Sequence, residues 1–364
     1  MPKQELTQEA ALAALSKVED PALGKDLIAL DAVRDLRIKG VEVSLRLVLA
    51  TPAHPFAQQI ENKTQAALEK AGAAKVKIEM DAEVPADGRQ RAGLAAGIKN
   101  AVAIASGKGG VGKSSVAVNV AVALAEAGAQ VGLLDADIYG PNIPTMMGVN
   151  HSMEPTGQGI PYAESYGLKV MSMGFFLPEG QAVVWRGPMI HGAIQQMLRD
   201  VEWGEMDYLV VDLPPGTGDA VLSLAQLVPL TGAVIVVTPS EVALEDGAKA
   251  ISMFKKLNVP VLGVIENMSY FLCPHCGERV DIFGRDGGQR IAQKYGLDFL
   301  GDIPVDPSVR IGGDDGVPVV AGMPESAPAQ RFIEVARGLA GKISVQNIGG
   351  AGAMSINIFA APQQ

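Results

Sequence analysis

Residues 106–115, SGKGGVGKSS, have the composition and spacing of a phosphate-binding loop. A short apolar run precedes them and an apolar pattern with helical spacing follows, which is the strand, glycine loop and helix that such a loop requires. Glycines let the backbone wrap a polyphosphate and point its N–H groups at the anion. Lys113 would place its charge on the β- and γ-phosphates, and the Ser114 hydroxyl would be a ligand of Mg²⁺. The residues of this loop predicted to bind ATP are Gly107, Lys108, Gly109, Gly110, Val111, Gly112, Lys113, Ser114 and Ser115.

A second lysine, Lys108, lies near the start of the loop, where the motif itself does not require one. Its side chain could reach phosphates bound by a neighbouring copy of the same loop. There it would neutralise charge in the transition state, as an arginine finger does in trans. From the pattern alone, a solvated surface lysine is the favoured interpretation at this position, and the classification of Lys108 with Lys113 as catalytic comes from the family resemblance given below.

Two motifs rich in aspartate follow two other apolar runs of the chain. Asp135 and Asp137 come directly after one run, and Asp212 ends another in the sequence DLPPGTGD. In parallel α/β sheets the ligand lies beyond the carboxyl ends of the strands, so these carboxylates would meet the phosphates there. We predict that Asp135 and Asp212 act with Ser114 around Mg²⁺, and that Asp137 orients and polarises the attacking water. Taken singly, each aspartate could instead cap a helix or lie in a solvated loop.

Cys273 and Cys276, in the sequence CPHCG, are the only cysteines of the chain. Their spacing lets two thiolates bind one metal. A thioredoxin-like redox pair would begin a helix, whereas roughly ten residues separate Cys276 from the next predicted helix, so metal binding is the favoured interpretation. Two thiolates cannot complete a four-thiolate site, but a symmetric dimer would bring two copies of the loop together.

Strand and helix patterns alternate between residues 99 and 342, which predicts an α/β domain with a doubly wound, mainly parallel sheet of the P-loop NTPase type. The predicted strands are 101–105, 131–134, 169–173, 208–211, 233–237, 261–265 and 298–301. The predicted helices are 113–127, 189–198, 219–227, 243–257, 289–294 and 328–340.

The remaining segments have different patterns. Residues 1–82 are predicted to form a small α/β domain, with a helix starting at Thr7, strands at 28–33, 36–38, 41–49 and 74–80, and a helix at 56–71. Residues 83–98 mix proline, glycine and small residues and are predicted to be a linker. Residues 343–364 contain no charged residue, and we expect this tail to be either unstructured or a strand on a partner.

Composition excludes several classes of protein. The chain has 364 residues, of which 48% are hydrophobic, enough for two domains with sizeable cores. The formal net charge of −10 argues against a general nucleic-acid binder, and no apolar run approaches the length that spans a membrane. The first residues lack the features of a signal or transit peptide, and two cysteines fit a reducing compartment, so we expect a cytoplasmic protein.

Several segments together resemble the Mrp/ApbC iron–sulfur cluster carriers, within the MinD/ParA group of P-loop ATPases. They are GKGGVGKSSVAVNVA, DADIYGPN, WRGPM, VVDLPPGTGD, ENMSYFLCPHCG and IPVDPSVRIGGDDGVPVV. The resemblance implies a homodimer that hydrolyses ATP slowly in a regulatory role, with Lys108 acting across the dimer and Asn267 hydrogen-bonded to the adenine. It also implies that Cys273 and Cys276 of both subunits hold a [4Fe–4S] cluster, which comes from an assembly scaffold and passes to apo-proteins. Asp219, and Trp185 and Arg186 of the WRGPM segment, are expected at the dimer face or in a switch region, without a chemical role.

The first domain resembles the MIP18-like domain of iron–sulfur assembly factors, through the segments DPALGKDLIAL and VSLRLVLATPAHP. Many members of that family have a cysteine where this chain has His54, which puts thiol chemistry of this domain in doubt. His54 is interpreted as a residue of a turn or helix start, with metal ligation as the alternative.

Other members of the MinD/ParA group fit the chain less well. A MinD-type protein ends in a basic amphipathic helix, a DNA-partitioning protein needs a basic surface, and a nitrogenase-type reductase bridges its cluster with cysteines far apart in sequence. An ATPase that targets tail-anchored proteins remains as the alternative function, because a C-x-x-C pair at a dimer interface serves zinc as well as an iron–sulfur cluster. Such a factor has a methionine-rich groove, whereas the 14 methionines here are scattered along the sequence.

Overall fold

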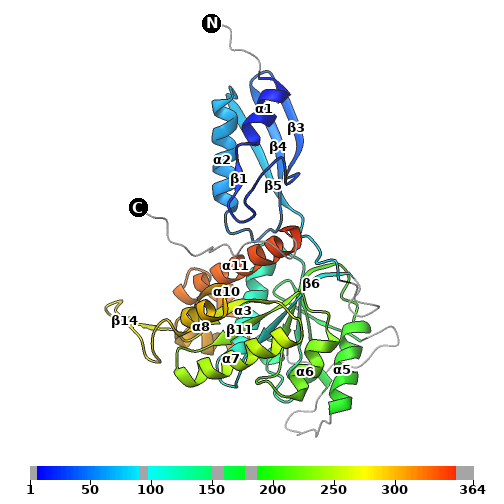
Figure 1. Cartoon of the computed structure of the whole chain (residues 1–364), viewed down its shortest axis with the longest axis vertical. Coiled ribbons are helices and arrows are strands. Elements are labelled where there is room, and N and C mark those ends of the chain that lie inside the picture. Colours follow the sequence, from blue (N-terminus) through cyan, green and yellow to red (C-terminus); the bar gives the residue numbers. More distant parts are fainter. Residues whose placement is uncertain (1–5, 90–96, 150–159, 177–186, 350–364) are drawn as a thin grey trace. The chain divides into compact units, whose positions relative to one another are not determined.

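The computed structural model describes residues 6–89, 97–149, 160–176 and 187–349 (Figure 1). Of these residues, those within Met1–Pro85 and Ala340–Ile358 form one compact unit, and those within Ala86–Leu339 form a second. Trp185, Arg186, residues 90–96 of the predicted linker and residues 350–364 of the tail lie outside the described residues.

The first unit is a small α/β structure. Its elements are α1 (Gln8–Leu15), β1 (Glu19–Asp20), β2 (Lys25–Asp26), β3 (Val33–Lys39), β4 (Glu42–Leu49), α2 (Ala57–Lys70) and β5 (Lys75–Ala82). The strand β4 lies in the centre of a three-stranded sheet, antiparallel to β3 and parallel to β5. Every second residue of β4 is buried, because alternation turns Val43, Leu45 and Leu47 to the face that α1 and α2 cover. Thr7 caps α1 as predicted, since its Oγ1 accepts a hydrogen bond from the N–H of Ala10.

The predicted strand at 28–33 is wrong for all but its last residue. Oδ1 of Asp26 accepts hydrogen bonds from the backbone N–H groups of Ile28 and Ala29, each at 3.0 Å, and this closes a turn. Asp31 has a φ of 52°, in the left-handed region, so the chain cannot extend before β3 begins.

The uncharged tail begins inside a helix. The helix α11 (Ala327–Gly349) continues through residues 343–349, which therefore form neither a strand nor an unstructured segment. Ile343 and Val345 are buried in it. Oγ of Ser344 donates to the carbonyl of Ala50 at 3.2 Å, and Nδ2 of Asn347 donates to the carbonyl of Pro85 at 2.9 Å. The end of α11 is therefore part of the first unit.

The second unit contains an eight-stranded sheet. In spatial order its strands are β15 (Phe299–Asp302), β12 (Val261–Glu266), β11 (Gly232–Val237), β6 (Ile98–Ala105), β10 (Met206–Asp212), β7 (Val131–Asp135), β9 (Leu168–Ser172) and β8 (Ala163–Ser165). All neighbours are parallel except β8 and β9. The seven strands predicted for this region are all present, and the mainly parallel α/β fold is confirmed.

Helices connect these strands. They are α3 (Lys113–Glu126), α4 (Ile143–Met146), α5 (Gly187–Arg199), α6 (Asp219–Leu227), α7 (Glu241–Lys256), α8 (Gly287–Tyr295), α9 (Pro307–Asp315), α10 (Val319–Gly322) and the first part of α11, with a 3-10 turn at Met173–Phe176. The predicted helices are all present, whereas α4, α9 and α10 were not predicted. The helix α3 packs on β6, β7 and β10, and α7 packs on β11 and β12. The loops that follow β6, β7 and β10 therefore meet at the carboxyl edge of the sheet.

A short antiparallel hairpin projects from the body of the second unit beside α8 (Figure 1). It consists of β13 (Phe271–Leu272) and β14 (Arg279–Val280). Across the described ranges, no helix is both long and apolar enough to cross a lipid bilayer.

Candidate functional site

The predicted phosphate-binding loop joins β6 to α3, and its conformation depends on glycine at two kinds of position. Gly110 and Gly112 have φ values of 79° and 76°, which favour glycine. Gly107 has ordinary φ, but a Cβ there would lie 2.0 Å from the carbonyl oxygen of Asp246 in α7. The loop is thus closely packed against α7.

Lys113, Ser114 and Asp212 form a buried cluster beneath this loop. Nζ of Lys113 lies 2.6 Å from Oδ1 of Asp212, and Oγ of Ser114 donates to Oδ2 of the same carboxylate at 2.6 Å. Burial raises the pKa of Asp212, and the charge of Lys113 acts in the opposite direction. A hydroxyl and a carboxylate in contact are oxygen donors of the kind that Mg²⁺ prefers, so these residues fit the predicted metal.

Asp135 lies next to this cluster but is held by the protein. Its Oδ1 accepts from the N–H of Asp137 at 3.1 Å, and its Oδ2 accepts from Oγ of Ser172 at 2.9 Å and from the N–H of Ile143. Burial, and after it the charge of Asp212, raise the pKa of Asp135 to about 8. Asp135 therefore fixes the loop after β7 in this structure.

A cavity of about 640 Å³ opens over the loop, a volume in the usual range for small-molecule sites. The predicted residues that line it are Lys108, Gly109, Gly110, Gly112, Lys113, Ser114, Ser115, Asp137 and Asn267. The predicted residues Gly107, Val111, Asp135 and Asp212 are not among those that line the cavity. Asp137 lines this cavity, and burial raises the pKa of its carboxyl group.

Asn267 follows β12 and is in direct contact with the loop. Its Nδ2 donates to the carbonyl of Val111 at 2.9 Å, and a Cβ on Gly112 would lie 2.2 Å from the same nitrogen. The side chain predicted to bind adenine therefore also holds the phosphate-binding loop from one side.

Sequence reasoning missed one wall of the cavity, which residues 304–314 form. Asp306 caps the N-terminus of α9 through a hydrogen bond from the N–H of Ser308 at 2.8 Å. On the next turn, Arg310 and Asp314 line the cavity and form an ion pair at 2.5 Å. The sequence Asp-Pro-Ser has the N-cap and Pro-at-N1 pattern of a helix start, and this signal could have revealed α9.

The two cysteines lie in the turn of the β13–β14 hairpin, away from the nucleotide cavity. Cys273 is half-buried and Cys276 is exposed. The N–H of Cys273 donates to the carbonyl of Glu278 at 2.9 Å, and the N–H of Gly277 donates back to the carbonyl of Cys273 at 2.8 Å. N–H groups of Cys276 and His275, and then the Cys276 thiol, bond the sulfur of Cys273 and lower the pKa of its thiol.

This arrangement turns two thiol groups toward one point and favours a thiolate, the form that binds metal. Among the residues that the structure describes, no group of three or more histidine, cysteine, aspartate or glutamate side chains could hold a metal ion. One copy of the hairpin supplies two thiol groups.

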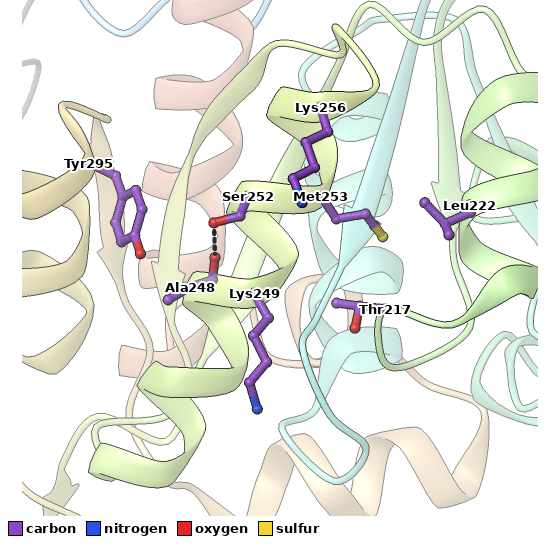
Figure 2. Close-up of a pocket in the computed structure, with 8 residues that line it drawn as sticks. All are labelled: Thr217, Leu222, Ala248, Lys249, Ser252, Met253, Lys256 and Tyr295. Carbon is purple, nitrogen blue, oxygen red and sulfur yellow. Dashed lines mark hydrogen bonds between the residues drawn. The ribbon is translucent and has the colours of Figure 1, made fainter.

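Another hollow, of about 470 Å³, lies over α7 and contains none of the predicted site residues (Figure 2). It is lined by Thr217, Leu222, Ala248, Lys249, Ser252, Met253, Lys256 and Tyr295. Oγ of Ser252 donates to the carbonyl of Ala248, and Nζ of Lys249 bonds Oδ1 of Asp246, each at 2.8 Å. Because these polar groups already have protein partners, we assign this hollow no role.

Comparison with known proteins identifies the family. Residues 97–340 match the family model described as NUBPL iron-transfer P-loop NTPase. The chain belongs to this family. Residues 8–80 match a second family model, described as iron–sulfur cluster assembly protein. The resemblances seen in the sequence, for both parts of the chain, are thereby confirmed.

Two bacterial relatives of this NUBPL-family chain cover nearly all of it. It is 47% identical over 351 residues to the iron–sulfur cluster carrier protein of Synechocystis sp., an alignment that includes 93% of this chain and 99% of the relative. It is 49% identical to the carrier protein of Deinococcus radiodurans, over 93% of this chain and 97% of the relative. It is 48% identical to the iron–sulfur cluster transfer protein NUBPL of Dictyostelium discoideum, over 69% and 79% of the two chains.

Solved structures support the same fold. A nucleotide-binding protein from Archaeoglobus fulgidus, in complex with ADP, superimposes with a TM-score of 0.53 at 41% identity, over 60% of this NUBPL-family chain and 87% of that protein. The cell division ATPase MinD of Pyrococcus furiosus superimposes with a TM-score of 0.52 at 23% identity, over 66% and 98% of the two chains, which shows a shared fold.

Proposed function

We propose that this protein is an ATP-binding iron–sulfur cluster carrier that holds a [4Fe–4S] cluster between two subunits and passes it to apo-proteins. The observation that carries the proposal is the hairpin of the NUBPL-family domain, which turns Cys273 and Cys276 outward as a two-thiolate half-site. The names of the relatives, carrier and transfer proteins, support the same function.

The nucleotide cavity supplies the ATPase part of the proposal. The loop backbone and Lys113 would hold the phosphates, and Ser114 and Asp212 would hold Mg²⁺, which neutralises charge on the β- and γ-phosphates when bound. In this structure the Lys113 ammonium bonds Asp212, so nucleotide binding would move it from carboxylate to phosphate. Asp137 faces the cavity and would orient the attacking water. We propose that hydrolysis is slow and regulatory.

Lys108 supports a dimeric arrangement of this ATPase. It lines the cavity at its edge, and its ammonium forms no ion pair with any residue in the described ranges. A free cation there can act on phosphates of a facing copy. We expect Lys108→Ala to retain ATP binding and lose hydrolysis, while Lys113→Ala loses both. An unchanged rate in Lys108→Ala would show that this lysine is only a surface residue.

Partners and location follow from the proposed cargo. A carrier receives its cluster from an assembly scaffold, and the first unit, which matches an iron–sulfur assembly family, is a candidate for that contact.

In this unit Nε2 of His54 lies 3.1 Å from Oδ2 of Asp20, and both side chains are buried, so His54 holds the turn before α2 together. The expectations of a cytoplasmic location and of no nucleic-acid partner stay predictions from composition.

The decisive experiment is anaerobic reconstitution with iron and sulfide, followed by metal analysis and sizing. A shared four-iron cluster predicts about two iron and two sulfide per chain on a dimer. Cys276→Ala should lose the cluster and keep ATP binding. His275→Ala, which changes an exposed residue between the two cysteines, is the matched control and should load normally. Full loading of Cys276→Ala would overturn the assignment.

The alternative of a targeting ATPase with structural zinc is not favoured by the names of the relatives. One structural feature favours it, since a targeting factor has a methionine-rich groove. Met173, Met189 and Met197 lie apart in sequence but line a common hollow of about 440 Å³. Zinc at about half an atom per chain, without cluster uptake, would restore this alternative.

A further inference from the structure

The two faces of the β13–β14 hairpin differ in chemistry. Phe271 pairs with Val280 and Leu272 pairs with Arg279 across the two strands. Because side chains alternate between faces along a strand, Val280 and Phe271 lie on the same face as Cys273, and Leu272 and Arg279 lie on the other. We call the first the cysteine face and the second the body face.

The body face is tied to the second unit. The guanidinium of Arg279 stacks on the ring of Tyr270, 4.1 Å from its centroid. Its Nε donates to Oδ1 of Asp281 at 2.9 Å, and its Nη1 lies 3.9 Å from Oδ2 of Asp302 at the end of β15. The base of the hairpin is held as well, since the N–H of Val305 donates to the carbonyl of Tyr270 at 2.6 Å. These contacts fix which way the cysteine face is turned.

The cysteine face and the residues after it expose apolar side chains. Val280 is 45% exposed, and Ile282 and Phe283, just after β14, are 52% and 47% exposed. Single exposed apolar residues are normal, but three within four positions beside an exposed thiol form a patch of the kind that marks an interface. Charged residues, Glu278, Arg285 and Asp286, flank it in the sequence and are exposed. An apolar centre with a polar rim is the composition of a protein–protein contact.

We propose that the cysteine face, with Val280, Ile282 and Phe283, is the surface on which two copies of this chain meet around the cluster. The occupant is a second copy because the hairpin supplies only two thiolates and a two-fold axis through this face brings in the other two. The apolar side chains exclude water from the metal and hold the pair of hairpins together without nucleotide. This inference rests on the proposed carrier function and adds the residues that build the contact.

Charge substitutions at Val280 test this. Near a two-fold axis, residue 280 of one copy would lie close to residue 280 of the other. Two copies of Val280→Asp, or two copies of Val280→Lys, should therefore repel each other because they bring like charges together. Each variant, reconstituted anaerobically without nucleotide, should dimerise at least about tenfold more weakly in sedimentation and lose iron to a chelator faster than the native protein. A one-to-one mixture of the two should recover the dimer and the slow iron loss, because opposite charges then meet.

Leu272→Asp is the matched control. Leu272 is 37% exposed on the same hairpin but belongs to the body face, so this variant should dimerise and load as the native protein does. ATP binding measured for all variants reports that the second unit is folded.

The inference fails if Val280→Asp and Val280→Lys both load and dimerise normally, if the mixture shows no recovery, or if Leu272→Asp is equally impaired. In those cases the carrier function stands as long as native protein loads and Cys276→Ala does not. If native protein takes up no cluster, the carrier function itself fails.

Discussion

The ammonium group of Lys113 lies 2.6 Å from Oδ1 of Asp212, and both side chains are buried, with 6% and 1% of their surface exposed. The two residues lie 99 positions apart in the chain, at the first residue of α3 and at the end of β10. In this structure the Asp212 carboxylate fixes the position of the Lys113 ammonium group at the carboxyl end of β10.

Removal of the Asp212 carboxylate should therefore destabilise the folded protein. Asp212→Ala leaves a buried cation without its partner, and we expect a loss of about 3–5 kcal/mol in the free energy of unfolding, measured with urea, together with loss of ATP hydrolysis. Asp207→Ala is the control on the same strand. Asp207 pairs with Lys99 in a more exposed position, so this change should cost less and leave hydrolysis intact. Equal loss of hydrolysis in both variants would contradict the assignment of Asp212 to the site.

Two glycines of the phosphate-binding loop should differ in their tolerance of a methyl group. In Gly107→Ala the new Cβ would meet the Asp246 carbonyl at 2.0 Å, and the loop or α7 must move. At Gly109 the nearest atoms are those of the Pro215 side chain at 4.0 Å. Calorimetric titration with ATP should show binding by Gly109→Ala and loss of binding by Gly107→Ala. Comparable affinities would mean that the loop is not held by α7 as described.

Asn267→Ala tests the double contact of this side chain. The change leaves the buried carbonyl of Val111 without its donor, at a cost of about 1–3 kcal/mol in folding stability. If Asn267 also binds the adenine, affinity for ATP should fall more than affinity for GTP. An equal fall for both nucleotides would show that Asn267 acts through the phosphate-binding loop alone.

The raised pKa of Asp135 predicts how stability of the metal-free protein depends on pH. The folded state binds the proton of this carboxyl up to a pKa of about 8, whereas the reference value is 3.8. Between these values the folded state holds more protons than the unfolded state, so stability from this group is complete below about pH 4 and lost as pH rises through about 8.

Urea unfolding between pH 5 and 9 with a chelator present measures this dependence, over the window in which the carboxyl of Asp135 would titrate. Asp135→Asn removes the titrating group and should flatten the curve over this range. A native curve that is already flat there would show that the carboxyl of Asp135 stays ionised in the folded protein.

Much of this molecule follows from local sequence patterns. Glycine spacing and apolar periodicity, which act over a few residues, were enough to predict the phosphate-binding loop and the parallel sheet. The failures come from interactions that periodicity does not contain. A turn closed by the Asp26 side chain replaced the expected strand at 28–33. The partners of Asp135 include Ser172, which lies 37 positions further along the chain and whose approach depends on the sheet order.

The same limit applies to the cysteines. From their spacing alone, the two cysteines could bind an iron–sulfur cluster, bind zinc or form a redox pair. The hairpin that turns them outward depends on Arg279, whose partners Tyr270 and Asp302 come from separate segments of the chain. Only the folded structure shows that one face of the hairpin contacts the rest of the second unit through Arg279, while the opposite face, with Val280, is exposed.

The first compact unit is made from two distant stretches of the chain, its opening residues and the end of α11. A single cut cannot release it whole. Cleavage near residue 90 would part the sheet from Ile343 and Val345, and a chain shortened to residue 339 would lose the same helical end. Any isolated form of this unit therefore has to contain both stretches of the chain.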